Sequence, residues 1–398
     1  MLVKSILKNT ALFCLGAAAS FLLVEAVLTS ASMTPLGKVL PLVEPELGQP
    51  DKNIGYTFRP NAQGLWTREN SAYIKINALG HRDKEVTLEK PAKVTRIMLL
   101  GDSVTEALQV EHEKTFEHIA EENLNAQNNS VEIVNLAMSG MGPLRQLVRL
   151  EHFGLPLSPD IAIFKFAPSG FTSGEMFDDS GNPGYKINNA DNIERSYSYR
   201  TRLSQRLMEN PAGKLFFFLI QNSHIFRKLN LKRKESLLKF LNLTLPDLSI
   251  NQQPKPPAKP QCNQSVFTPQ YDLWIKHKPD HSWLAVKKFT KELAAHNLKS
   301  ILMLRLPLPQ KECPNDIRMR KEIIKFMNQY FKNHDMIFID EMTEIAKTMK
   351  LEPYKNQEIK NLRGFGLSLG NGHLNYRGHR IYAQTLERVL QQYQNIIH

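Results

Sequence analysis

A serine and a histidine stand far apart in this chain of 398 residues, and together they could carry nucleophilic catalysis. Ser103 follows a Gly-Asp pair at the end of an apolar run. A serine hydroxyl is a weak nucleophile unless a neighbouring base takes its proton, so Ser103 needs a histidine from elsewhere in the fold. We predict that this base is His373, in the turn-rich stretch 370–375, because the competing His379 falls inside the expected final helix. The alternative interpretation of Ser103 is a strand-end serine that only caps a helix.

The elements around these two residues predict an α/β fold. Short apolar runs, typical of parallel strands buried on both faces, recur five times, at 96–100, 131–134, 161–164, 300–304 and 336–339. Amphipathic stretches of helix length lie between and after these runs, at 113–126, 283–296, 317–332 and 378–392. The alternation predicts a three-layer α/β/α sandwich around a flavodoxin-like, parallel five-stranded sheet. Ser103 then follows the first strand of this sheet and His373 the last, so both should reach its carboxyl edge.

The N-terminal segment is long and apolar enough to anchor the chain in a membrane. Residues 10–31 are mostly apolar, and a helix of about 20 residues spans a bilayer. Because two lysines precede this span, we predict a cytoplasmic tail at 1–9, a single-pass signal-anchor and a periplasmic or extracellular body. A cleaved signal peptide is the alternative, since small residues around Ser30 could serve as a cleavage site.

The rest of the chain is expected to divide into a preface, a core and an insertion. Residues 32–92, rich in turn residues and aromatics, form a preface of loops and short strands. The core follows in two parts, 93–170 and 281–398, and the distance between its third and fourth strands requires an insertion at 171–280. The insertion holds an apolar run at 215–220 followed by basic residues, and it ends in a proline-rich linker. It is either a lid that touches the membrane or a helix pair packed on the core.

Composition narrows the partners and the compartment. The formal net charge is +12, but the basic residues are scattered and form no zinc-finger or RNA-recognition signature, which argues against nucleic-acid binding. A basic surface instead favours anionic lipid or an acidic polysaccharide. In an oxidising compartment, Cys262 and Cys313 could form a disulfide or remain as two free thiols.

Three sequence blocks together resemble the SGNH (GDSL-type) hydrolase superfamily, in a membrane-anchored form. The blocks lie in order on the expected strand ends, at 101–103, 135–142 and 372–379. The resemblance implies a serine-dependent ester hydrolase or O-acyltransferase that needs no cofactor and no metal. It makes Ser103 the nucleophile and His373 the base, with the backbone N–H groups of Ser103 and Gly140 in the oxyanion hole. Losing one such donor typically costs roughly 10²–10³ in rate.

Two positions depart from the family pattern. After the third strand, where the family has an asparagine donor, the chain has Ser169, which either completes the oxyanion hole or leaves it with two donors. Just before the histidine, where the family has an aspartate, the chain has Asn371, whose amide could orient His373. An amide does not offset the charge of an imidazolium, and an Asp→Asn change in a serine protease triad lowers turnover about 10⁴-fold. The alternatives are a working Ser–His dyad, a carboxylate from elsewhere in the fold, or a scaffold whose catalysis has decayed.

The expected substrate is an acyl ester of a polysaccharide or of a lipid, and the motifs do not separate hydrolysis from acyl transfer. The alternative from another class is a catalytically weak or inactive binding or assembly protein of the cell envelope with the same fold. The sequence predicts no particular oligomeric state.

Overall fold

A computed structural model gives the structure of the chain, and we describe eight segments of it. These are residues 2–32, 45–51, 54–127, 129–167, 184–187, 193–196, 211–226 and 281–393.

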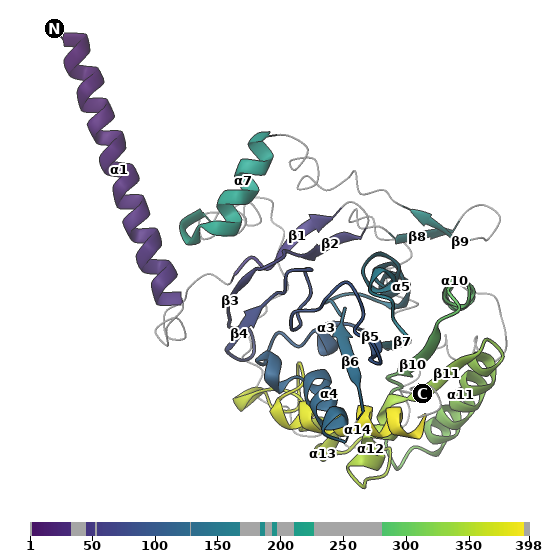
Figure 1. Ribbon diagram of the computed structural model, residues 1–398. Coiled ribbons are helices and arrows are strands. Elements are labelled where there is room, and N and C mark those ends of the chain that lie inside the picture. The colour runs from purple at the N-terminus through teal and green to yellow at the C-terminus, as the bar shows by residue number, and fades with distance from the viewer. Residues whose placement is uncertain are drawn as a thin grey trace.

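A five-stranded parallel sheet forms the centre of the molecule (Figure 1). Its strands are β5 (Thr95–Leu100), β6 (Val131–Asn135), β7 (Ile161–Phe166), β10 (Lys299–Leu304) and β11 (Met336–Asp340). They lie in the order β11-β10-β7-β5-β6, and every neighbouring pair is parallel. In chain order the sheet therefore reads 2-1-3-4-5, the flavodoxin-like order, and the sequence prediction is confirmed.

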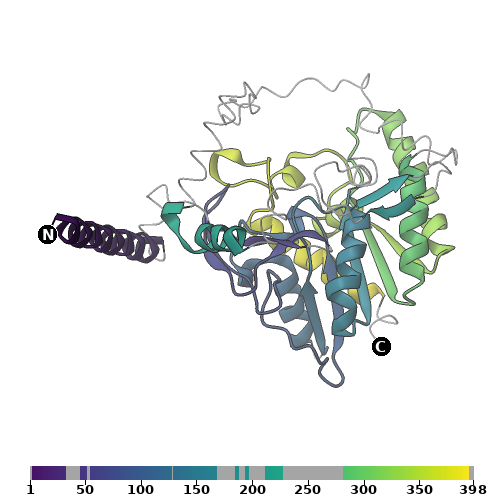
Figure 2. The same ribbon diagram turned by 90° about the horizontal axis from the view of Figure 1, so that it is seen from above.

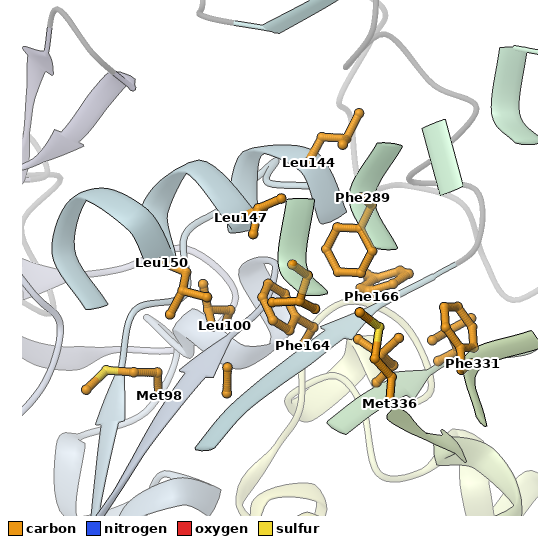
Figure 3. Packing of buried hydrophobic residues seen from close by; sticks show 14 of the residues in the cluster. Met98, Leu100, Leu144, Leu147, Leu150, Phe164, Phe166, Phe289, Phe331 and Met336 are labelled. Atoms are coloured by element: carbon orange, nitrogen blue, oxygen red, sulfur yellow. The ribbon is translucent and has the colours of Figure 1, made fainter. Parts of the chain in front are cut away.

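Helices cover both faces of this sheet, as the continuous apolar strands require. One face packs against α5 (Pro143–Arg149), α10 (His281–Ala294) and α11 (Pro314–Lys332), through the residues drawn in Figure 3. The other face packs against α4 (Phe116–Ala126), α12 (Glu341–Thr348) and α14 (Tyr376–Gln392). Alternate residues of β5 separate accordingly, with Met98 and Leu100 in the first cluster and Ile97 and Leu99 in the second. The three-layer sandwich is thus held by two separate hydrophobic clusters.

The preface folds onto the carboxyl edge of the sheet. It contains two antiparallel pairs, β1 (Gly48–Asp51) with β2 (Gly55–Phe58), and β3 (Gln63–Trp66) with β4 (Ala72–Lys75). A third hydrophobic cluster joins preface residues such as Ile74 to Leu108, Met138 and Met141. Those three residues lie in the loops that follow β5 and β6. The preface therefore packs on the loops where a ligand of an open α/β sheet is expected.

The N-terminal helix α1 (Leu2–Ser32) projects away from the body of the protein (Figures 1 and 2). Its residues Asn9–Ala31 are long and apolar enough for a membrane span or a signal sequence, in agreement with the prediction at 10–31. Near its C-terminal end, Glu25 accepts a hydrogen bond from Ser223 (2.9 Å), just after α7 (Pro211–Asn222). The apolar run of the insertion thus lies on a helix beside α1.

Most of the predicted insertion lies outside the described residues, including its proline-rich linker. The described parts are α7 and a short antiparallel pair, β8 (Gly184–Ile187) with β9 (Ile193–Ser196). Cys313 is disulfide-bonded and Cys14 is a free thiol. Cys262, the other half of the expected pair, also lies outside the described residues.

Candidate active site

Ser103 lies where β5 turns into a short helix, α3 (Ser103–Glu106). The turn is tight, because a Cβ on Gly101 would lie 2.3 Å from Thr105 Oγ1, which only glycine avoids. Asp102 caps the helix, since its side chain accepts a hydrogen bond from the backbone N–H of Val104 (2.9 Å). The interpretation of Ser103 as a mere cap is therefore wrong. The serine is half-buried at the carboxyl edge of the sheet.

The loop that carries Gly140 is fastened directly to the Ser103 turn. The backbone N–H of Met138 donates to the carbonyl of Gly101 (3.1 Å), and the Ser139 hydroxyl donates to the buried carboxylate of Glu106. Gly140 itself is exposed, with a φ of +73° that favours glycine, and no atom of the described residues lies within 4 Å of the position of a Cβ. Among the described residues, the Cβ side of Gly140 is therefore free of packing. Ser169, the other expected donor, lies outside the described residues.

His373 is paired with a carboxylate that comes from the preface. Its ring nitrogen Nδ1 lies 2.7 Å from Glu69 Oε1, and its backbone N–H donates to Glu69 Oε2 (2.9 Å). The two carboxylate oxygens of Glu69 therefore both bind His373, one at its ring and the other at its backbone. With the Nδ1 proton directed at Glu69, Nε2 is left as the acceptor that a general base needs.

The approach of Glu69 depends on unusual backbone at both partners. Glu69 lies in the turn between β3 and β4 with a φ of +65°, a left-handed conformation that is uncommon for a residue other than glycine. Gly372 has a φ of +84°, and a Cβ there would lie 2.5 Å from Glu69 Oε2. Such conformations persist only where the surrounding structure imposes them, and they gather at functional sites.

Glu69 replaces Asn371 as the partner of the histidine. The backbone N–H of Asn371 donates to the carbonyl of Ser368 (3.0 Å) in the same loop, while Nδ1 of His373 is engaged by the carboxylate. Of the three alternatives left open by the sequence, the geometry therefore matches the carboxylate borrowed from elsewhere in the fold. Sequence reasoning missed Glu69 because it is 304 residues from His373 and lies in no recognisable motif.

The same preface turn joins the two loops that carry the serine and the histidine. Asn70 donates to the carbonyl of Gln109 (2.8 Å), six residues after Ser103, and also to the hydroxyl of Tyr376 (3.1 Å), three residues after His373. The Tyr376 hydroxyl in turn donates to Glu111 (3.3 Å). The preface thus bridges the first and the last loop of the core at the edge where Ser103 lies.

The competing histidine, His379, has a structural role. It is buried in α14, and its Nδ1 accepts a hydrogen bond from the backbone N–H of Phe116 (3.1 Å). Burial, aided by the charges of Arg82 and Lys165, lowers the pKa of His379 to about 3. A buried, neutral ring whose nitrogen already accepts a hydrogen bond from a backbone N–H is a poor general base. His379 is therefore a weaker candidate for the base than His373.

A partly buried chain of charges, which is not among the predicted site residues, lies behind the Ser103 turn. Arg305 Nη1 lies 3.5 Å from Asp102 Oδ2, and Arg305 Nε donates to Glu341 (3.1 Å), which also pairs with Lys165. Burial alone would raise the pKa of Glu341, but Lys165 and Arg305 outweigh burial and lower that pKa. Lys165 lies on β7, while Arg305 and Glu341 directly follow β10 and β11. A polar residue at the end of an otherwise apolar strand is the signal that could have revealed this chain.

The fold and these contacts define a three-layer sandwich with a serine, a carboxylate-paired histidine and an exposed glycine loop at one edge. No family model matches the chain, and no curated protein matches it. Solved structures similar to the chain include the psychrotrophic esterase EstA from Pseudoalteromonas sp. (10% identity, 76% of this chain and 99% of that chain, TM-score 0.33). Two others are the lipase/acylhydrolase from Enterococcus faecalis (13%, 75% and 96%, TM-score 0.35) and a member of the lipolytic protein G-D-S-L family from Veillonella parvula (12%, 75% and 99%, TM-score 0.34).

Proposed function

We propose that the chain is a serine-dependent ester hydrolase or O-acyltransferase with a Ser103–His373–Glu69 triad. The observation that carries the proposal is the bidentate contact of Glu69 with the ring and backbone of His373. A histidine held by a carboxylate is the arrangement that activates a serine nucleophile on unrelated folds. Ser103 and His373 are carried by loops that the preface turn joins, which supports their acting together.

In this mechanism, His373 Nε2 accepts the proton of Ser103 while the serine oxygen attacks the carbonyl carbon of the ester. The negative charge that develops on the carbonyl oxygen is met by the backbone N–H groups of Ser103 and Gly140. The imidazolium is stabilised by Glu69, which stays ionised. The imidazolium then returns its proton to the leaving alcohol as the carbon–oxygen bond breaks, giving an acyl-enzyme on Ser103. Water or a sugar hydroxyl, deprotonated by His373, takes the acyl group and restores the serine.

The placement of the site favours an ester of the cell envelope. We propose that α1 tethers the protein to the membrane, with residues 1–9 in the cytoplasm and the body in the periplasm or outside the cell. The disulfide at Cys313 supports an oxidising compartment. Beside α1, the exposed Leu215 and Phe218 of α7 supply apolar surface that suits the membrane interface. The substrate is then an acylated polysaccharide or a lipid ester.

A fluorophosphonate probe, which reacts with activated serines, tests this proposal. We expect the wild-type protein to be labelled and Ser103→Ala to be unlabelled, because the proposed nucleophile is lost. Ser130→Ala is the matched control, since Ser130 is exposed just before β6, at the opposite edge of the sheet from Ser103. If wild-type protein and Ser103→Ala label equally poorly, the protein is the non-catalytic envelope protein that the sequence left as the alternative.

A further inference from the structure

A cavity of about 390 Å³ opens beside the candidate active site. Its described lining includes four basic side chains, Arg305, Lys355, Lys360 and Arg363, and no acidic one. The remaining lining is mostly apolar and is supplied by the loop after β10, by α12 and by the segment around α13 (Gln357–Lys360). The volume lies at the lower end of the ~300–1,000 Å³ typical of small-molecule sites, so the cavity suits a group of about the size of a sugar.

Two of these basic residues connect the cavity to the two halves of the catalytic pair. Arg305 contacts Asp102 (3.5 Å), which precedes Ser103. Arg363 Nη1 donates to the carbonyl of Gly372 (3.1 Å), which precedes His373. The cavity is therefore walled by side chains that touch the nucleophile loop on one side and the histidine loop on the other.

The positive charge of the cavity is only partly neutralised. Arg305 is balanced by Glu341 and Asp102 in the buried charge chain. Arg363 donates to a neutral carbonyl, and neither Lys355 nor Lys360 forms an ion pair within the part of the chain that the structure describes. Both lysines are exposed at the cavity, one before α13 and one at its last residue. Several positive charges without acidic partners around a concave site attract an anion.

We propose that this cavity binds an anionic group, a carboxylate or a phosphate, that the ester substrate carries near its scissile bond. The inference deepens the proposed function and rests on it, because it narrows the substrate to an acidic ester. An acidic sugar would supply a carboxylate, and a lipid headgroup would supply a phosphate. Both are recognised by the same charge-assisted hydrogen bonds from lysine and arginine.

Binding to the full-length Ser103→Ala protein tests the inference without requiring turnover. Three probes share one fluorescent aryl group: 4-methylumbelliferyl glucuronide, 4-methylumbelliferyl phosphate and the neutral 4-methylumbelliferyl glucoside. We expect at least one of the two anionic probes to bind about tenfold tighter than the glucoside, the gain expected of roughly one charge-assisted hydrogen bond. A tighter glucuronide would indicate the acidic sugar, and a tighter phosphate the headgroup.

Two paired variants separate the cavity from the overall charge of the protein. Lys355→Gln/Lys360→Gln should reduce the preference for the anionic probe to about twofold or less, whereas Lys321→Gln/Lys325→Gln should leave it intact. The second pair removes the same net charge from exposed positions of α11. Raising the salt concentration should weaken binding of the anionic probe and leave that of the glucoside unchanged. Equal affinities for all three probes, or a preference that survives the loss of Lys355 and Lys360, would overturn the inference even if Ser103 labels as proposed.

Discussion

The core and the preface contribute to the candidate site in different ways. The core supplies Ser103 and His373 from loops at the edge of a sheet that is buried on both faces. The preface supplies Glu69 from the turn of a two-stranded pair, with a left-handed backbone and a side chain that is 31% exposed. The core therefore positions its residues through regular structure, whereas the preface relies on a single turn held against its partner.

This difference indicates how the two parts depend on each other. The hydrophobic clusters of the sandwich are formed by the strands and helices of the core, and among the described preface residues Val86 is their only buried member. The preface, which carries the carboxylate of Glu69, packs on Leu108, Met138 and Met141 at the carboxyl edge. Changes in the core should therefore remove catalysis or folding, and changes at the contact with the preface should weaken catalysis while leaving the fold intact.

Glu69→Gln tests the contribution of the preface most directly. The amide keeps the shape of the side chain but does not balance an imidazolium, so turnover of an aryl acetate should fall about 10²–10³-fold. We expect less than the ~10⁴-fold loss of a buried triad aspartate, because water partly screens the half-exposed Glu69. Steady-state kinetics measure the loss, and Glu89→Gln, at another exposed position of the preface, should keep full activity. Unchanged turnover in Glu69→Gln would reduce the site to a Ser–His dyad.

Gly372→Ala tests the same contact from the side of the core, with a smaller expected effect. The added methyl would lie 2.5 Å from Glu69 Oε2, so the carboxylate must move away from the ring, and turnover should fall about 10–10²-fold. Gly366→Ala is the matched control, because Gly366 also has a positive φ (+56°) but meets no atom of the described chain within 4 Å of its Cβ position. Backbone strain is common to both variants, so only Gly372→Ala should lower turnover strongly. Equal losses in the two variants would assign the effect to strain in the loop.

The sequence predicts the core well because each strand and helix of the core is encoded by the pattern of neighbouring residues. Each strand is an apolar run, each helix is amphipathic, and their alternation allows few arrangements of the sheet. Ser103 and His373 could be placed for the same reason, since both directly follow strands or precede a helix whose position the pattern defines. The polar neighbours of the strand ends, Arg305 and Glu341, have such positions too, but their pairing depends on which strands are adjacent in space.

The partner of His373 could not be predicted in this way. The contact of Glu69 with His373 depends on the orientation of the preface turn. This orientation depends on the packing of β3 and β4 on loops that are distant in sequence. No local pattern distinguishes Glu69 from the other exposed acidic residues of the preface. Asn371, which lies near His373 in sequence, was for that reason the natural choice, whereas in the structure Nδ1 of the ring lies 2.7 Å from Glu69 Oε1.

Asn371→Asp tests whether Asn371 or Glu69 orients the ring of His373, and of the three substitutions it has the smallest expected effect on turnover. If Asn371 oriented the ring, a carboxylate in its place should speed hydrolysis of an aryl acetate substantially. Because Nδ1 of His373 already lies 2.7 Å from Glu69, we expect a change of about twofold or less, the size of a distant charge screened by water. The same substitution in the Glu69→Gln background is the sharper measurement, since there the new aspartate could take over the vacant role. Recovery of turnover in the double variant would show that the loop can carry its own acid. No recovery would show that only the preface places a carboxylate where the ring can use it.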